Sequence, residues 1–175
     1  MSYFVLRQLP VLSPDCFGEL SPFAAHRPPL ALQDWLAPRV LELTYTAHDL
    51  TSLARDCGYD RPPFLWDDAR RFTIRCELDA AFFHLYLPCE PDGSWRKAEG
   101  ETPEQLTALK RHFPQPRDAM AYILDQFPIV RQKDERTHGS YRTKECILEI
   151  YDALLTAQRS GRSYQTKLTP PPGSR

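Results

Sequence analysis

The densest group of side chains that could do chemistry lies in a polar stretch at residues 131–144. Two apolar segments with helical spacing flank it. Arginine, lysine and histidine side chains can donate hydrogen bonds to phosphate or carboxylate oxygens, and the start of a following helix also favours anions. The candidate nucleic-acid-binding residues are Arg131, Lys133, Arg136, His138, Tyr141, Arg142 and Lys144.

The polar stretch has two interpretations. One is a solvated loop between helices, because runs of charge usually lie in solvent. The other is a loop that binds DNA phosphate or a protein partner. Asp134 and Glu135 neutralise the cations in the first interpretation. In the second, Arg142 and Lys144 stand near a helix N-terminus, where the macrodipole disfavours cations by about 0.3–1 kcal/mol, and an anionic ligand offsets that cost.

A helix is predicted on either side of this stretch. The first should end at Phe127, because Pro128 disfavours an α conformation in the residue before it. Ile129 and Val130 should then return to the core, and Ser140 should cap the second helix. The buried faces, from i, i+3, i+4, i+7 spacing, are Met120, Ile123, Leu124 and Phe127 in the first helix and Ile147, Ile150, Tyr151 and Leu154 in the second.

A family resemblance rests on strings that follow one another along the chain. They are YFVLRQLPVL (3–12), RVLELTYTAHDL (39–50), ARDCGYD (54–60), ELDAAFFHLY (77–86) and FPIVRQKDERTHGSYRTKECILEIYDAL (127–154). Together they resemble the C-terminal region of large adenine-specific DNA methyltransferases of type IIG restriction–modification and related, BREX-like phage-defence systems. The resemblance implies a non-catalytic module that assists DNA placement or braces the catalytic domains of a parent that uses S-adenosylmethionine.

Motifs of catalysis are missing from the sequence. A methyltransferase needs a glycine-bearing turn for its methyl donor and an N/D-P-P-Y/F tetrapeptide for the flipped adenine. The sequence has no G-x-G, and Arg27 and Arg61 precede its first two Pro-Pro pairs. No G-x-S-x-G elbow occurs. We therefore predict no catalytic residue and no cofactor for this chain alone. The alternative to a methyltransferase module is a stand-alone protein–protein interaction module that binds other defence-system subunits.

Cysteine spacing predicts no metal site. The five cysteines include no C-x-x-C pair, and His84 and Cys89 alone are too few ligands for a zinc site. The cysteines are typical of reduced thiols in a cytoplasmic protein. No apolar run approaches the roughly 20 residues of a membrane helix, and a signal peptide is not expected.

Charge is distributed unevenly along the chain. The net charge of −1 combines −6 over residues 1–109 with +5 over residues 110–175. A basic C-terminal third suits nucleic acid or an acidic partner, although the chain as a whole is not strongly basic.

The expected fold is mainly α, with one helical domain at residues 1–159 and a minor extended element near the N-terminus. Residues 1–31 should be an extended or loop arm, and residues 160–175 a disordered tail, since they are polar and rich in proline. The longest helix is predicted at residues 69–86, capped by Asp67 or Asp68. Its apolar face should contain Phe72, Leu78, Ala81, Phe82 and Leu85, together with the stem of Arg75. Glu77 and Asp79 should be surface charges or a salt-bridge partner for Arg75.

Residues 88–103 are predicted to form a flexible, turn-rich loop. Trp95 stands there beside Arg96 and Lys97. It has two interpretations: an aromatic that stacks on a base, or a loop-tip side chain that covers the edge of the core.

Overall fold

Helices account for most of the residues that the computed structural model describes, which are 11–24, 30–98 and 100–173. No strand forms among these residues, which contain only two isolated bridges, Leu20–Ala31 and Cys89–Trp95. The mainly α fold is therefore confirmed. The extended element predicted at residues 3–12 lies outside the described residues, apart from Val11 and Leu12. The helices are η1 (Pro14–Gly18), α2 (Leu32–Thr44), η2 (His48–Leu50), α3 (Thr51–Asp56), α4 (Asp68–Tyr86), α5 (Pro103–His112), α6 (Pro116–Asp125), α7 (Pro128–His138) and α8 (Arg142–Ser160).

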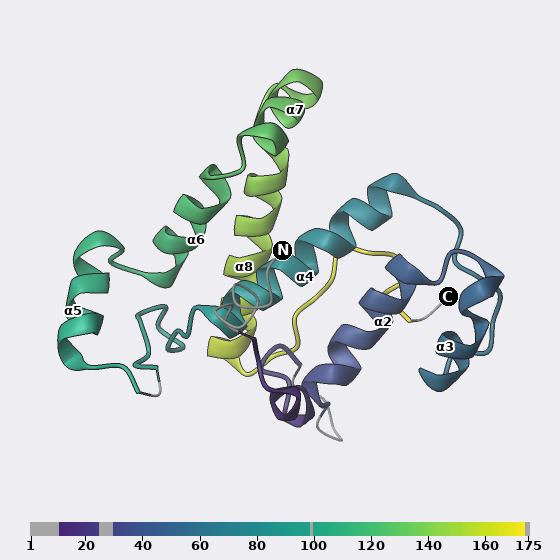
Figure 1. Cartoon of the computed structure of the whole chain (residues 1–175), viewed down its shortest axis with the longest axis horizontal. Coiled ribbons are helices and arrows are strands. Elements are labelled where there is room, and N and C mark those ends of the chain that lie inside the picture. Colours follow the sequence, from purple (N-terminus) through teal and green to yellow (C-terminus); the bar gives the residue numbers. More distant parts are fainter. Residues whose placement is uncertain (1–10, 25–29, 99, 174–175) are drawn as a thin grey trace, which may run out of the picture.

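The centre of the fold is the contact between α4 and α8, which pack against each other more extensively than any other pair of described elements. Figure 1 shows α2 and α3 on one side of this pair and α5, α6 and α7 on the other. The predicted face of α8 is confirmed, since its four apolar residues are at most 2% exposed. They are Ile147, Ile150, Tyr151 and Leu154.

The long helix α4 begins where the sequence predicts, because the Asp67 side chain accepts a hydrogen bond from the Arg70 N–H at 2.9 Å. Its predicted face is only partly right. Phe72, Leu78 and Phe82 are half-buried, whereas the fully buried side chains are Ile74, Cys76, Glu77, Ala80, Ala81, Arg70 and His84. The interpretation of Glu77 as a surface charge was wrong, since its exposure is 0%. Asp79 is exposed, as expected.

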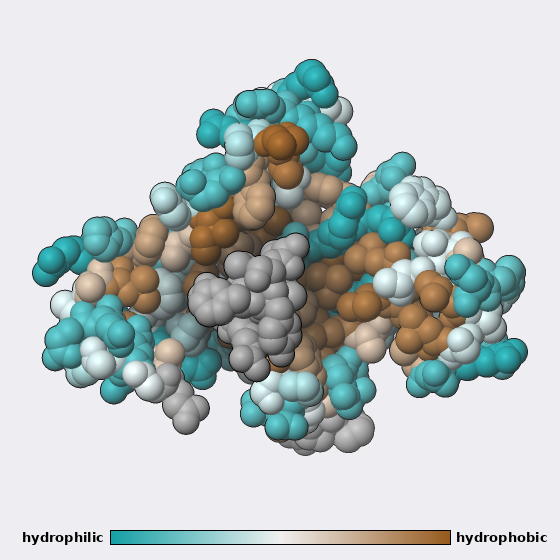
Figure 2. Space-filling model, viewed as in Figure 1, coloured by the Kyte–Doolittle hydropathy of each residue, from teal (hydrophilic) through white to brown (hydrophobic). Residues whose placement is uncertain are grey.

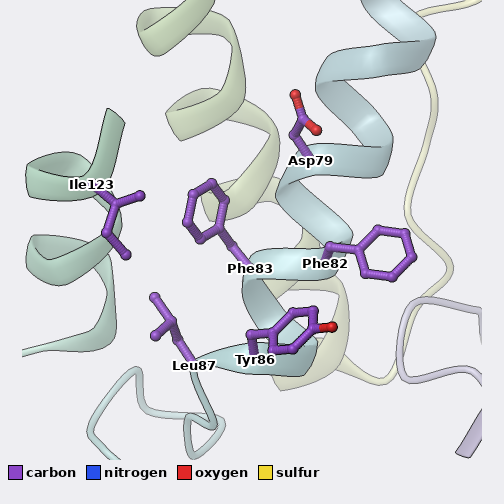
Figure 3. Close-up of a pocket in the computed structure, with 6 residues that line it drawn as sticks. All are labelled: Asp79, Phe82, Phe83, Tyr86, Leu87 and Ile123. Carbon is purple, nitrogen blue, oxygen red and sulfur yellow. The ribbon is translucent and has the colours of Figure 1, made fainter. Parts of the chain in front are cut away.

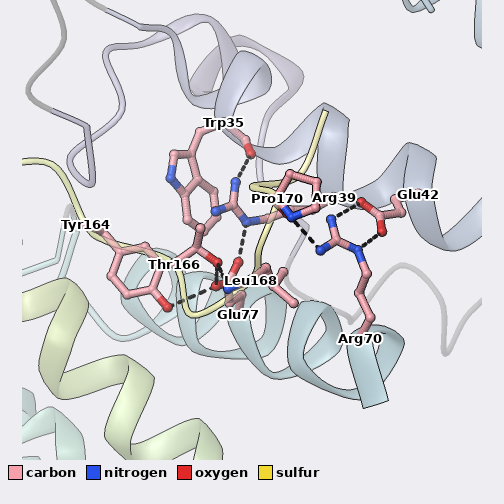
Figure 4. A network of polar contacts seen from close by, with 9 residues as sticks. All are labelled: Trp35, Arg39, Glu42, Arg70, Glu77, Tyr164, Thr166, Leu168 and Pro170. Carbon is pink, nitrogen blue, oxygen red and sulfur yellow. Dashed lines mark hydrogen bonds and ion pairs between the residues drawn. The ribbon is translucent and has the colours of Figure 1, made fainter. Parts of the chain in front are cut away.

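Glu77 is buried because it has partners on two other segments (Figure 4). The Arg39 guanidinium of α2 lies 2.8 Å from its carboxylate. The Tyr164 hydroxyl, 3.0 Å away, and the Thr166 hydroxyl donate hydrogen bonds to the other carboxylate oxygen. Burial and the nearby charge of Glu77 raise the pKa of Tyr164, so its hydroxyl keeps the proton that it donates. A buried carboxylate thus joins α2, α4 and the segment after α8.

A second buried ion pair lies further along the same two helices. Arg70 of α4 pairs with Glu42 of α2, with one nitrogen–oxygen distance of 2.8 Å, and also donates to the Pro170 carbonyl at 2.8 Å. The bidentate contact suits the planar guanidinium group. No buried side-chain nitrogen or oxygen in the described part of the chain lacks a hydrogen-bond partner. The burial of four charges is therefore compensated, as buried charges require.

The segment after α8 differs from the disordered tail that composition predicts. Helix α8 ends at Ser160 with Gly161 as its C-cap, and the Tyr164 N–H then donates to the Phe23 carbonyl at 2.9 Å. Leu168 is buried, with 8% of its surface exposed. Composition predicts disorder because the segment is polar and rich in proline. Three of its side chains, Tyr164, Thr166 and Leu168, nevertheless hold it against the helices.

Candidate functional site

The polar stretch singled out by the sequence is a helix, α7, followed by a tight turn. The expectation of a loop was wrong, and so was the expected return of Ile129 and Val130 to the core. Helix α6 already ends at Asp125, and Pro128 suits the first turn of a new helix, where its missing N–H leaves no bond unmade. Gly139 then ends α7 in the left-handed conformation, with φ of 77°. Ile129 is 81% exposed and Val130 37%.

Helix α7 lies at the edge of the molecule, beside the first turns of α8 (Figure 1). None of its residues is buried. Two side chains hold the corner between α7 and α8 in place. Asp134 accepts a hydrogen bond from the Thr143 N–H at 2.6 Å, and the buried Tyr141 hydroxyl donates to the Leu124 carbonyl at 2.9 Å. Tyr141 is thus fixed inside the corner, away from a surface ligand.

Ser140 is not the cap that the sequence predicts for α8. Its hydroxyl donates to Glu145 at 2.9 Å, and no side chain of the N-cap residue Tyr141 caps the helix. Asp134 has that role instead, from the neighbouring helix. Sequence inspection missed it because the donor and acceptor are nine residues apart, beyond the range of local capping patterns.

Three of the predicted cations interact with other groups of the chain. Arg131 pairs with Glu135 at 2.7 Å, one turn away on α7, and Lys144 pairs with Asp125 at 2.7 Å. The Arg142 guanidinium lies 4.2 Å from the centroid of the Phe72 ring. These contacts engage three of the five lysine and arginine side chains of residues 131–144. The sequence does not predict the ion pair between Lys144 and Asp125, because Asp125 belongs to the preceding helix, α6.

Two cations, Lys133 and Arg136, form no ion pair with any residue in the described part of the chain, and both are exposed. With Ile129 they follow i, i+4, i+7 spacing, so these three side chains share one helical face. We call this set the outward face of α7. Val130 and Asp134 belong to the opposite side, toward α8. His138 is also exposed, and its Nε2 lies 3.4 Å from an Arg142 nitrogen.

A histidine–cysteine pair elsewhere has the residue types of a catalytic dyad. Cys89 Sγ lies 3.5 Å from His84 Nδ1, and His84 Nε2 lies 3.0 Å from the Tyr151 carbonyl. A carbonyl can only accept, so Nε2 carries the proton and Nδ1 faces the thiol. Burial lowers the pKa of His84 to about 4 and raises the pKa of Cys89. Both groups are therefore neutral near pH 7, whereas a nucleophilic cysteine requires a lowered pKa.

Trp95 is buried at 6% exposure, and its indole N–H donates to the Phe113 carbonyl at 2.8 Å. The ring thus covers the edge of the core, and stacking on a base would require it to leave this site. The described residues contain no group of three or more histidine, cysteine or acidic side chains able to hold a metal ion. They also contain no helix that is long and apolar enough to cross a bilayer.

Comparisons with protein families, with curated proteins and with solved structures find no match to this chain.

Proposed function

We propose that this chain is a non-catalytic helical module that binds another protein through the outward face of α7. The partner is the catalytic part of a DNA-modifying adenine methyltransferase or, alternatively, another subunit of a phage-defence complex. The family resemblance suggests both. The observation that carries the proposal is the exposure of Ile129 beside two cations without ion-pair partners, on a helix with no buried residue.

An exposed apolar side chain next to cations has the chemistry of a protein interface. Interfaces commonly combine an apolar centre with a polar rim. Ile129 and the half-exposed Phe127 supply apolar area at the start of α7, and Figure 2 shows apolar surface at the junction of α6 and α7. Lys133 and Arg136 would form the rim and select an acidic partner surface.

DNA is the second candidate partner, because the same two cations can contact phosphate. Residues 125–145 carry five Lys/Arg and four Asp/Glu, a net charge of +1. Two phosphate contacts would give a slope of only about −1.8 in log K against log salt. Contact with phosphate leaves Ile129 without a role. The exposed isoleucine therefore favours protein over DNA.

The test is a binding titration with the recombinant catalytic part of an adenine methyltransferase from the same organism as the probe. Ile129→Ser and the pair Lys133→Glu/Arg136→Glu should each weaken binding at least tenfold. The matched control is Lys110→Glu/Arg111→Glu in α5, which makes the same charge change on exposed cations of another helix. Equal affinity for all variants, or no binding by the parent chain, would overturn the proposal.

A parallel titration with a mixed-sequence DNA duplex separates the two candidates. The protein-binding proposal expects weak DNA binding, with a salt slope of at most about two phosphate contacts between roughly 50 and 200 mM salt. Ile129→Ser should not change it. A slope of about six contacts or more would favour DNA. Labelled S-adenosylmethionine with the same duplex should give only background methyl transfer.

A further inference from the structure

Two cysteines meet in the contact between the central helices α4 and α8. Cys76 of α4 is buried, with 1% of its surface exposed, and belongs to the main hydrophobic core. Cys146 of α8 is half-buried and packs against the same core. The two thiols share a hydrogen bond. One sulfur of this pair is thus enclosed, and the other can be reached from solvent.

Contacts on either side of the cysteines show how the two helices face each other. Phe72 and Arg142 each precede a cysteine by four residues, one helical turn, and the guanidinium lies 4.2 Å from the centroid of the ring. Phe83, seven residues after Cys76 on the same face of α4, lines a hollow together with Ile147 of α8. Figure 3 shows the Phe83 ring in the space between α4 and α6. The face of α4 that carries Cys76 therefore packs on the first turns of α8.

The surroundings of Cys146 favour its thiolate. The hydrogen bond from the Cys76 thiol lowers the pKa of Cys146 more than burial raises it. The positive charges of Lys167 and Arg142 also lower this pKa. Lys167 is held nearby by an ion pair of 2.6 Å with Glu149, which follows Cys146 by three residues on α8. The thiolate is the nucleophilic form of cysteine, so Cys146 has the environment of a reactive thiol.

We propose that Cys146 and Cys76 form an oxidant-sensitive site, at which a hydroperoxide links α8 to α4 through a disulfide. In the first step the Cys146 thiolate attacks one oxygen of the hydroperoxide and the O–O bond breaks. The sulfur gives up two electrons and becomes a sulfenic acid. The second oxygen takes up the proton that Cys146 lost and leaves as water or an alcohol. This site lies apart from the outward face of α7 and goes beyond the proposed function.

Cys76 completes the disulfide in a second step. Its sulfur attacks the Cys146 sulfur, the S–O bond breaks, and the departing hydroxide takes the Cys76 proton and leaves as water. The hydrogen bond to Cys146, followed by burial, raises the pKa of Cys76 in the reduced pair. Oxidation of Cys146 removes the thiolate that accepts this hydrogen bond. The first step therefore makes the Cys76 proton easier to lose when the second step requires it.

Mass analysis of the folded full chain after treatment with hydrogen peroxide tests the site. The chain carries Cys57→Ser, because Cys57 is an exposed thiol that would link two copies. The expected product is a monomer that has lost two hydrogen atoms, contains a 76–146 disulfide in its peptide map, and returns to its original mass with dithiothreitol. Cys89→Ala is the matched control, since it removes another buried cysteine and should leave this disulfide unchanged. Absence of a 76–146 disulfide, or its formation only in denaturing urea, would overturn the proposal.

Trapping with dimedone, which labels sulfenic acids, tests which cysteine attacks the hydroperoxide. In Cys76→Ala the sulfenic acid persists, so dimedone should label Cys146. In Cys146→Ala the buried Cys76 should stay unlabelled. The opposite pattern would overturn the assignment of the two roles.

The rate of disulfide formation tests the surroundings without a change in the core. Lys167→Gln removes a cation beside Cys146 and should slow the reaction with hydrogen peroxide several-fold. The matched control is Lys110→Gln in α5, which removes an exposed cation of another helix and should leave the rate unchanged. Equal rates for the two variants would contradict the activation of Cys146 by its neighbouring charge.

The disulfide should also change the stability of the folded chain. It closes the long loop between α4 and α8, and cross-links across long loops restrict the unfolded chain most. The oxidised chain should therefore melt several degrees higher than the reduced chain. A lower melting temperature would mean that the bond strains the contact between α4 and α8, and would contradict the close approach of the two thiols.

Discussion

The carboxylate of Asp134 on α7 accepts a hydrogen bond from the backbone N–H of Thr143, 2.6 Å away, and so caps a helix to which it does not belong. The first N–H groups of a helix have no partners within it, and α8 has no side-chain cap at its own N-cap residue. The negative charge of Asp134 also complements the macrodipole there. This position explains how α8 can begin with the cations Arg142 and Lys144 in its first turn.

Asp134→Ala should lower the free energy of unfolding by about 0.5–2 kcal/mol, the range for loss of a helix cap. Denaturant unfolding of the full chain measures it. Glu135→Ala is the matched control, since the neighbouring acid forms only an exposed pair with Arg131, and its removal should cost no more than about 1 kcal/mol. If Asp134→Ala proves the milder of the two changes, the capping interpretation is wrong.

Glu77→Ala should be among the most destabilising single substitutions in the chain. It leaves the buried Arg39 guanidinium without its carboxylate and removes the acceptor of the Tyr164 and Thr166 hydroxyls. Removal of one partner of a buried ion pair costs about 3–5 kcal/mol. Urea unfolding should show this loss.

The double variant Arg39→Met/Glu77→Leu tests whether the loss comes from a stranded charge. Replacement of both charges by apolar groups removes the desolvation cost, so the double variant should be more stable than Glu77→Ala. Both variants lack the acceptor of the Tyr164 and Thr166 hydroxyls, so a double variant less stable than Glu77→Ala would mean that the contacts of Arg39 with Trp35 outweigh the cost of its stranded charge.

The helical faces that pack in the core could be predicted from the sequence, but the partners of the buried charges could not. Apolar spacing in α8 predicts its buried face because a 3.6-residue period leaves few alternatives. Glu77 has the residue type of a surface position, and its partner Arg39 is 38 residues away. Nothing local to either residue indicates their contact.

The corner around α7 was misjudged for a different reason. Apolar periodicity is absent from residues 131–138, so a loop was predicted. The capping signals were nevertheless present, with Pro128 at the first turn and Gly139 at the end. A helix that lies in solvent needs no apolar stripe, and only its two ends mark it. Residue type alone identifies the candidate binding residues. Which of them form ion pairs depends on where Asp125 and Glu135 lie in the folded chain.

Leu154→Ala should cost about 2–5 kcal/mol, because Leu154 is fully buried between α8 and the rest of the core. Leu53→Ala in α3 is the control, since Leu53 is 43% exposed and such substitutions usually change stability by less than about 0.5 kcal/mol. Thermal or denaturant unfolding measures both. An unchanged melting temperature for Leu154→Ala would contradict the assignment of the α8 face to the core.

The stability of the chain should fall with pH below about 6.5 because of His84. Its pKa is about 4 in the folded chain, lowered by burial, and near the ordinary 6.5 in the unfolded chain. Between these values the unfolded state binds a proton that the folded state does not. The contribution of neutral His84 to the stability of the folded chain is therefore fully present above about pH 6.5, and it is lost as the pH falls toward 4. The linkage relation gives a loss of about 2 kcal/mol between pH 7 and pH 5 from this group.

Comparison of pH profiles isolates this contribution from those of the carboxylates. His84→Gln removes the titrating ring but keeps a donor for the Tyr151 carbonyl, which His84 contacts at 3.0 Å. Its absolute stability is lower, because the ring stacks on Tyr151 with centroids 3.8 Å apart, but its decline from pH 7 to pH 5 should be about 2 kcal/mol smaller than that of the parent chain. Parallel profiles for the parent chain and His84→Gln would mean that His84 can be protonated in the folded state, and that the buried contact with Cys89 opens at low pH.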